Sequence, residues 1–315
     1  MMLSIIIPFH NEAENLPTLI KHLIEVCEKA GKEFEIVLVD DGSDDTSVAI
    51  SNFQFLLRQA QDPEQSRGTI SKKIKLIKHK KRLGKGEALN TGVKNAVGNV
   101  IVFMDADLQN DPEDLPKLLA KIDEGNDFVN GIRKGRHDDN LLLKSYSFLA
   151  EKFLKKFIQS PFTDINCGYK AFKKVVLSEF SFYGNNFRFF PLAVFYNGYK
   201  VTEIEVKNNP RKFGKSKFGS GKLITGIFDT LTAYFIYKFA AQPLHFFGVI
   251  GGLLFTGGFI ISLILAVERL FFGVLLYQRP VLWLGLALII VGIQIIMTGI
   301  IGELIVYLDK KNTKS

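Results

Sequence analysis

Short apolar runs alternate with amphipathic segments through the first two thirds of the chain. Leu3–Ile7, Phe34–Val39 and Lys75–Lys78 are apolar or alternating runs of the kind that predict β-strands. Between the first two, Leu16–Ala30 repeats apolar residues at helical spacing and stops before Gly31. Strand, helix and strand in this order predict an α/β domain with a mainly parallel sheet.

The same alternation continues along the chain. Val100 begins an apolar run that stops at Asp105, and a helix is expected after it, with Asp111 as its cap and Pro112 in its first turn. We expect the Leu141–Ile158 helix to pack on the sheet, to face lipid, or to do both. Further predicted elements are a helix ending near Val97 and strands at Phe128–Arg133 and Tyr199–Val206.

Two nearly uncharged segments, Leu244–Val267 and Val281–Gly302, occupy the C-terminal end. Each exceeds the roughly 20 residues that a helix needs to cross a bilayer, and their short link predicts a hairpin. An amphipathic helix is predicted before them, lying in the membrane interface. We therefore divide the chain into an N-terminal α/β domain (1–220), a juxtamembrane amphipathic helix (221–240), and two transmembrane helices with a short tail (241–315).

The positive charge of the chain bears on its binding partners and on its orientation in the membrane. The net charge of +8 favours anionic partners, namely phosphates, an acidic membrane face or nucleic acid. The predicted spans and the lack of an aromatic and basic platform argue against nucleic acid. Lysines crowd before the first span and after the second, which predicts that both termini and the N-terminal α/β domain face the cytoplasm. These lysines are Lys215, Lys217, Lys222, Lys238, Lys310, Lys311 and Lys314.

An acidic corner follows the apolar run that begins at Val100. In an extended backbone, Asp105, Asp107 and Gln109 would point to the same side, because alternate residues share a face. Carboxylate and amide oxygens suit a hard divalent cation such as Mg²⁺ or Mn²⁺, which completes its shell with substrate phosphates. The sequence therefore predicts a metal site at the carboxyl end of a central strand, where open α/β sheets bind ligands.

Other polar segments fit an anionic ligand at the same edge. Lys80–Ala88 is a basic turn with two glycines that let the backbone approach a phosphate, and Lys85 supplies charge. It is not a Walker loop, because neither Ser nor Thr follows the lysine. Asp40–Asp45 follows the second strand, Thr163–Lys170 is expected to be a loop near the site, and Arg211–Lys217 is a cationic segment.

Together these motifs resemble those of family 2 glycosyltransferases, in the same order along the chain. The likeness is to the polyprenyl-phosphate branch, which contains the dolichyl-phosphate mannose synthases and the bacterial undecaprenyl-phosphate glucosyltransferases. It implies a GT-A-like nucleotide-binding domain and a place in the bacterial inner membrane. The motifs that carry it are Pro8–Glu12, Asp40–Ser43, Gly84–Gly86, Asp105–Gln109, Asp164–Lys170 and Arg211–Lys217.

The resemblance also implies roles for individual residues. The nucleotide base and ribose would be held by Pro8, Glu12, Asp40 and Asp41. Lys85, Asp105 and Ala106 would complete the nucleotide site, and the metal would be bound by Asp107 and Gln109 beside Asp105. Arg133, Arg211 and Lys217 would surround the pyrophosphate and the acceptor phosphate. Asp164 stands where relatives carry a proposed catalytic carboxylate, and it would either act as a general base or orient the substrates.

Two positions depart from the family pattern. His10 stands where the family usually has tyrosine, and Arg82 stands where it often has asparagine. Either difference would shift the preference for nucleotide or sugar.

The implied reaction is inverting transfer of a hexose from a nucleotide sugar, of the UDP-glucose or GDP-mannose type, to a polyprenyl phosphate. Association into homo-oligomers through the spans is compatible with this. A glycan or lipid hydroxyl as acceptor, and a non-catalytic membrane scaffold, are the alternatives. A processive polysaccharide synthase is excluded, because its Gln-x-x-Arg-Trp motif is missing and Trp283, the one tryptophan, lies inside the second span.

Overall fold

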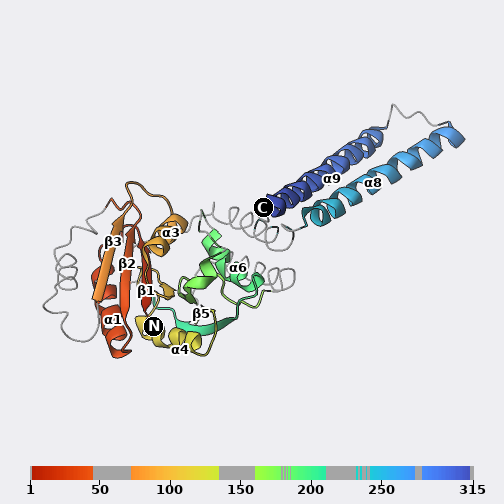
Figure 1. Ribbon diagram of the computed structural model, residues 1–315. Helices are drawn as coiled ribbons and strands as arrows, with labels where there is room; N and C mark the ends of the chain where they lie inside the picture. The colour runs from red at the N-terminus through yellow and green to blue at the C-terminus, as the bar shows by residue number, and fades with distance from the viewer. Residues whose placement is uncertain are drawn as a thin grey trace. The chain divides into compact units, whose positions relative to one another are not determined.

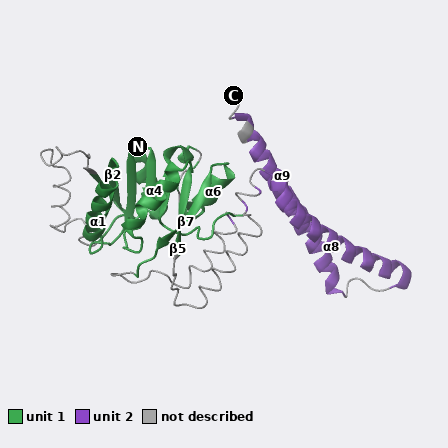
Figure 2. Cartoon of the chain, turned by 90° about the horizontal axis from the view of Figure 1, so that it is seen from below, with its two compact units in different colours: residues 1–230 green, residues 231–315 purple. Residues whose placement is uncertain are grey.

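The computed structural model contains two compact units, residues 1–230 and 231–315, which are described separately (Figure 2). It describes residues 2–44, 72–134, 160–178, 180, 182, 184, 186–210, 242–273 and 279–312, with 232, 235 and 239. Three predicted segments lie outside the described residues: the 141–158 helix, the cationic segment 211–217, and nearly all of the amphipathic helix at 221–240.

A seven-stranded sheet forms the centre of the first unit (Figure 1). Its order is β3-β2-β1-β4-β6-β5-β7, and every neighbouring pair is parallel except the two that β6 makes. The predicted mainly parallel sheet is therefore confirmed. The strands are β1 (Leu3–Phe9), β2 (Phe34–Asp40), β3 (Lys72–Lys78), β4 (Val100–Phe103), β5 (Phe128–Lys134), β6 (Lys170–Lys173) and β7 (Val201–Lys207).

One face of the sheet is covered by α1 (Leu16–Lys29) and α4 (Leu115–Asp123). The apolar stripe of each helix packs on alternate strand residues, such as Ile5 in β1, because every second side chain of a strand points to the same face. The predicted cap is also confirmed, since the carboxylate of Asp111 accepts a hydrogen bond of 3.0 Å from the amide of Glu113. A 3-10 turn at Pro112–Asp114 then leads into α4.

The opposite face carries α3 (Lys85–Asn95) and α6 (Phe190–Tyr196). Helix α3 lies close to the sheet at Gly92, where an added Cβ would come 2.3 Å from Cγ2 of Ile6. Beside it, phenylalanine rings pack edge to face, with centroids 4.9 Å apart for Phe103 and Phe172. This aromatic layer fills the space between α6 and the middle of the sheet.

Strand β6 was not predicted. A loop was expected over Thr163–Lys170, whereas Lys170 begins a short strand that pairs antiparallel with both β4 and β5. In this register Lys170 lies opposite Phe103, the last residue of β4. The strand therefore brings residues 163–169 to the carboxyl end of β4, next to the acidic corner.

The second unit is a hairpin of α8 (Pro243–Phe272) and α9 (Pro280–Asn312). Both helices are long and apolar enough to cross a membrane, judged by length and composition. Glycines bring them close together, since a Cβ on Gly251 would come 2.6 Å from the carbonyl oxygen of Gly292. The carboxylate of Glu303 in α9 accepts a hydrogen bond of 3.4 Å from the amide of Leu244 in α8.

Candidate active site

The loops after β1, β2 and β4 meet at one edge of the sheet, because the carboxyl ends of parallel strands share that edge. Two hydrogen bonds join the first two loops. The amide of Asn11 donates to Oγ of Ser43, and the amide of Asp44 donates to Oδ1 of Asn11, each at 3.0 Å. The first two acidic motifs of the sequence therefore form one connected surface.

Asp105 lies in a pocket at this edge. The pocket has an empty volume of about 350 Å³ including its open mouth, and its lining includes Pro8, Lys85, Asp105, Gly168, Lys170 and Arg188. Lys85, in the first turn of α3, donates a hydrogen bond to Oδ1 of Asp105. Burial raises the pKa of Asp105, but the charges of Lys85 and Arg133 outweigh it and hold that pKa below its usual value. The carboxylate is therefore ionised at neutral pH.

The extended backbone expected for the acidic corner is wrong. Strand β4 ends at Phe103, and Leu108 has a φ of +60°, so the chain turns before Gln109. Such a φ is strained for leucine and is found mostly where surrounding structure imposes it. The amide of Gln109 then donates to Oδ1 of Asp107 at 3.2 Å. Asp107 and Gln109 are therefore adjacent because of a turn and not because of strand alternation.

The donor set at this turn suits a divalent cation. Among the described residues, no three His, Cys, Asp or Glu side chains gather into a metal cage. Mg²⁺ does not require one, because it takes one or two protein carboxylates and completes its shell with phosphates and water. The ionised Asp105, with Asp107 and the amide oxygen of Gln109, supplies oxygens of this kind. Ala106, between the two carboxylates, is buried.

Asp41 holds the glycine turn in place. Its two carboxylate oxygens accept hydrogen bonds of 2.8 Å from the amides of Leu83 and Gly84, and a ring nitrogen of His79 lies 3.0 Å away. Burial raises the pKa of Asp41, and these partners more than reverse the effect, so its pKa is lowered. Asp41 thereby positions the start of α3 and with it Lys85.

Two other predicted nucleotide residues lie at the end of β2 and in the loop after β1. Asp40 is fully buried, and its Oδ1 accepts a hydrogen bond from the amide of Ser43 at 2.8 Å. Its second oxygen has no hydrogen-bond partner among the described residues, and Nζ of Lys78 lies 3.6 Å from it. Glu12, in the loop after β1, accepts a hydrogen bond from the side chain of Asn15 at 2.6 Å.

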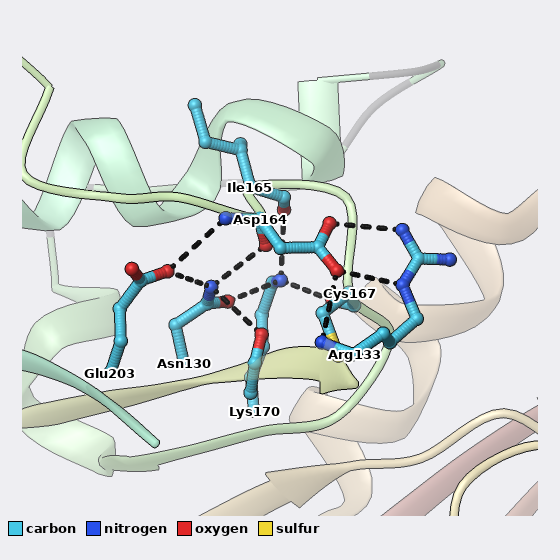
Figure 3. A network of polar contacts seen from close by, with 8 residues as sticks. Asn130, Arg133, Asp164, Ile165, Cys167, Lys170 and Glu203 are labelled. Atoms are coloured by element: carbon cyan, nitrogen blue, oxygen red, sulfur yellow. Dashed lines mark hydrogen bonds and ion pairs between the residues drawn. The ribbon is translucent and has the colours of Figure 1, made fainter. Parts of the chain in front are cut away.

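Arg133 and Asp164 form a two-pronged ion pair beside the pocket (Figure 3). Nε and Nη2 of Arg133 donate to the two carboxylate oxygens at 2.7 and 2.9 Å. Burial alone would raise the pKa of Asp164, but Arg133 lowers it below its usual range. Burial would likewise lower the pKa of Arg133, and Asp164 raises it instead. Both groups are therefore charged throughout the neutral range.

Sequence reasoning missed the polar side chains that hold this ion pair in place. Lys170 stood in the polar motif without a role, and Asn130 and Glu203 lay inside predicted strands, so no local signal marked them. In the structure the side-chain amide of Asn130 donates a hydrogen bond to Glu203 and accepts one from the ammonium of Lys170 (Figure 3). Glu203 also accepts a hydrogen bond of 2.7 Å from the amide of Thr163.

The structure thus gathers most of the predicted site at one edge of the sheet. Pro8, Lys85 and Asp105 line one pocket. Arg133 adds to the electrostatic field at Asp105, although Arg133 lies in β5 and Asp105 follows β4. Arg211 and Lys217 lie outside the described residues, so their predicted contact with phosphates stays a prediction.

Known proteins match both the sequence and the fold. Residues 4–181 match the family described as glycosyl transferase family 2. An undecaprenyl-phosphate 4-deoxy-4-formamido-L-arabinose transferase of Pectobacterium atrosepticum is 33% identical over 309 residues, which cover 97% of this chain and 89% of the relative.

Solved structures of a glucosyl-3-phosphoglycerate synthase from Mycobacterium tuberculosis share the fold at low identity. The complex with Mn²⁺, UDP-glucose and phosphoglyceric acid matches with a TM-score of 0.54 and 15% identity, over 74% of this chain and 79% of the other. The complex with UDP alone gives a TM-score of 0.53 and 16% identity, over 74% and 80% of the two chains. With its family motifs and its mostly parallel α/β sheet, the chain belongs to glycosyl transferase family 2.

Proposed function

We propose that this glycosyltransferase moves a sugar from a nucleotide donor to a polyprenyl phosphate, with undecaprenyl phosphate as the acceptor, at the cytoplasmic face of a bacterial inner membrane. The observation that carries the proposal is the charge of the pocket. Among the described residues, Lys85, Lys170 and Arg188 line it together with one carboxylate, Asp105. Such a pocket suits anionic groups, and this reaction must bring two of them together.

The Arg133–Asp164 pair favours a phosphate acceptor over a hydroxyl. A sugar or lipid hydroxyl must lose its proton during attack and needs a base with a suitable pKa. The pKa of Asp164 is lowered by Arg133, which makes it a weak base. A phosphate monoester has its second pKa near about 6 and is already largely a dianion at neutral pH. We therefore assign Asp164 an orienting and electrostatic role, with Arg133, Arg211 and Lys217 around the phosphates.

The donor is proposed to be a nucleotide-linked hexose of the UDP-glucose or GDP-mannose type, attacked in one displacement that inverts the anomeric centre. The Pectobacterium relative is named for an arabinose derivative, so pentose donors belong in the same test. Pro8, Glu12, Asp40 and Asp41 would hold the base and ribose.

Asp105, Asp107 and Gln109 would hold Mg²⁺ or Mn²⁺, which when bound neutralises charge on the departing diphosphate. Lys85 adds fixed positive charge at the same place, because its ammonium already lies against Asp105. Solved complexes of the Mycobacterium synthase contain Mn²⁺ with UDP-glucose or UDP.

The chain is proposed to cross the membrane twice through α8 and α9, with both ends in the cytoplasm and the three-part division at 220 and 240. Two long apolar helices support the spans, and the lysines that flank them support the orientation. Association of copies through these helices is compatible with the arrangement.

A panel of radiolabelled nucleotide sugars tests the proposal. The purified protein would be incubated with undecaprenyl phosphate and Mn²⁺, and the lipid product would be extracted and cleaved with mild acid, which releases sugar from a phosphodiester. A single productive donor, with activity lost in EDTA, is expected. Transfer to a hydroxyl acceptor and not to the lipid phosphate would replace this proposal with the hydroxyl alternative, and metal-independent nucleotide binding without transfer would favour a scaffold.

A further inference from the structure

Lys170 adds charge to the pocket, but the reaction outlined above gives its buried ammonium no specific contact to make. It is 4% exposed, although lysine is rarely buried unless a carboxylate pairs with it. Its ammonium donates hydrogen bonds to Oδ1 of Asn130 at 2.8 Å, to the carbonyl of Ile165 at 3.0 Å, and to the carbonyl of Cys167 (Figure 3). All three acceptors are neutral, and within the described chain no carboxylate lies in ion-pair contact with it.

These three hydrogen bonds converge on one segment. Ile165 and Cys167 belong to the loop that β6 brings to the end of β4. Asn130, in β5, reaches the same loop with its amide nitrogen, which donates to the carbonyl of Asp164 at 2.8 Å. The ammonium of Lys170 therefore joins the loop to the sheet at both ends of the short turn between Asp164 and Gly168.

The loop fixed in this way carries the ion pair and covers the acidic corner. Asp164 begins it and is bound to Arg133, while Gly168 ends it and lies against the carboxylate of Asp105. Lys170 also lines the pocket itself. A displacement of this loop would move the Asp164–Arg133 pair and the wall of the pocket together.

A purely structural role explains this arrangement poorly. Removing water from an ammonium costs free energy, and the three neutral acceptors of Lys170 attract it less strongly than a paired carboxylate would. Burial lowers the pKa of Lys170 to about 8, which reflects the same cost. The three hydrogen bonds of the ammonium offset part of this cost.

We propose that Lys170 is a positioning residue of the transfer reaction, which acts with Asn130 to hold residues 164–168 so that Asp164, Arg133 and Asp105 face the pocket in the geometry that transfer requires. The inference rests on the proposed function, because that reaction defines the geometry. It predicts that the order of residues 164–168 depends on the buried ammonium of Lys170.

Lys170→Met tests this, with Lys173→Met as its matched control. Lys173 lies in the same strand, but it is paired at the surface with Asp127 at 2.9 Å. The Lys170 variant should lose kcat by on the order of 100-fold, which is typical of small misplacements in active sites, with little change in donor KM. Its melting temperature should stay close to that of the wild type, and the control should keep normal kcat.

Hydrogen exchange gives a readout independent of turnover. In Lys170→Met the amides of 163–169 should exchange at least tenfold faster than in the wild type, while those of β1 and β2 keep their protection. Unchanged exchange in this segment would overturn the inference even if the wild type transferred no sugar. Wild-type inactivity with every donor and acceptor would instead count against the proposed function alone. Normal kcat in Lys170→Met beside an active wild type would also overturn the inference.

A double-mutant cycle with Asn130→Ala tests whether the two residues act as a unit. If they do, the double variant should lose no more kcat than the worse single variant, because each substitution already releases the same loop. Losses that multiply would show two independent effects and would refute the positioning role.

Discussion

Gly168 and Asp105 approach each other so closely that a side chain at position 168 would displace the Asp105 carboxylate or the loop. A Cβ added to Gly168 would lie 2.3 Å from Oδ2 and 2.6 Å from Cγ of Asp105. The two residues are far apart in the sequence and meet because β6 returns the chain to the end of β4. The end of the 164–168 loop therefore lies against the acidic corner, and the carboxylate of Asp105 is paired with Lys85.

Gly168→Ala should therefore disable the enzyme without unfolding it. The methyl group must push either the Asp105 carboxylate or the loop away, and a misplacement of about 1 Å in an active site typically costs on the order of 100-fold in rate. Sugar transfer and the melting temperature would be measured together.

Gly198→Ala is the control for that substitution. Gly198 has a φ of +82° with nothing within 4 Å of an added Cβ, so alanine there strains the backbone but displaces no neighbour. It should lower stability modestly and leave transfer intact. If Gly168→Ala kept normal activity, the contact with Asp105 would have no role in the site.

Asp164→Asn should reduce stability in a pH-dependent way. The pKa of Asp164 is lowered in the folded protein, so its ion pair stabilises the fold above the unfolded pKa of about 3.9 and stops doing so as the pH falls through the folded pKa. At pH 7 the variant leaves Arg133 without its partner, at a cost of about 1–3 kcal/mol.

Denaturant unfolding of both proteins between pH 3 and pH 8 measures this effect. The difference in unfolding free energy should be constant from pH 5 to pH 8 and should shrink below about pH 4. A difference that first appeared near pH 7 would mean that Asp164 titrates in the neutral range and could serve as a general base after all.

Asp107→Ala should abolish transfer while the protein stays folded, because it removes a proposed metal ligand and little packing. Asp111→Ala is the matched control, since Asp111 caps the next helix and pairs with Lys207. The control should lose about 1 kcal/mol of stability and keep its activity. Full activity of Asp107→Ala in the presence of EDTA would rule out the metal site.

The hairpin offers neighbouring glycines with opposite expected outcomes. Gly251→Leu would force a side chain against the backbone of α9, because even a Cβ there comes 2.6 Å from the carbonyl oxygen of Gly292. Overpacking of this kind costs about 1–3 kcal/mol. Gly252→Leu should be tolerated, because nothing lies within 4 Å of its Cβ. Thermal unfolding in detergent compares them, and equal melting temperatures would contradict the packing of α8 on α9.

Regular elements could be predicted wherever a segment has a strong pattern of its own. The buried strands, the amphipathic α1, the Asp111 cap and the two apolar helices all follow from neighbouring residues. The four-residue β6 could not be predicted, because a strand this short becomes stable through its pairing with β4 and β5.

The site divides in the same way. Motif order along the chain predicted the family and the edge of the sheet where Asp105 and Lys85 meet. The assumed strand geometry of the acidic corner was wrong, because the φ of Leu108 is imposed by the surrounding fold and has no local signature in a leucine. Likewise, no neighbouring residue indicated that the carboxylate of Asp41 would accept hydrogen bonds from the backbone amides of the glycine turn.

The sequence by itself thus determined the α/β order, the apolar hairpin and the chemical character of the site, since each depends on residue types at short spacing. Only the tertiary structure decided which charges meet. Lys85 binds Asp105 from 20 residues away, Arg133 binds Asp164 from 31, and Lys170 reaches Asn130 from 40. Strand order and the free-energy cost of burying an unpaired charge determine which of these distant residues interact. Neither factor can be inferred from residues that are neighbours in the sequence.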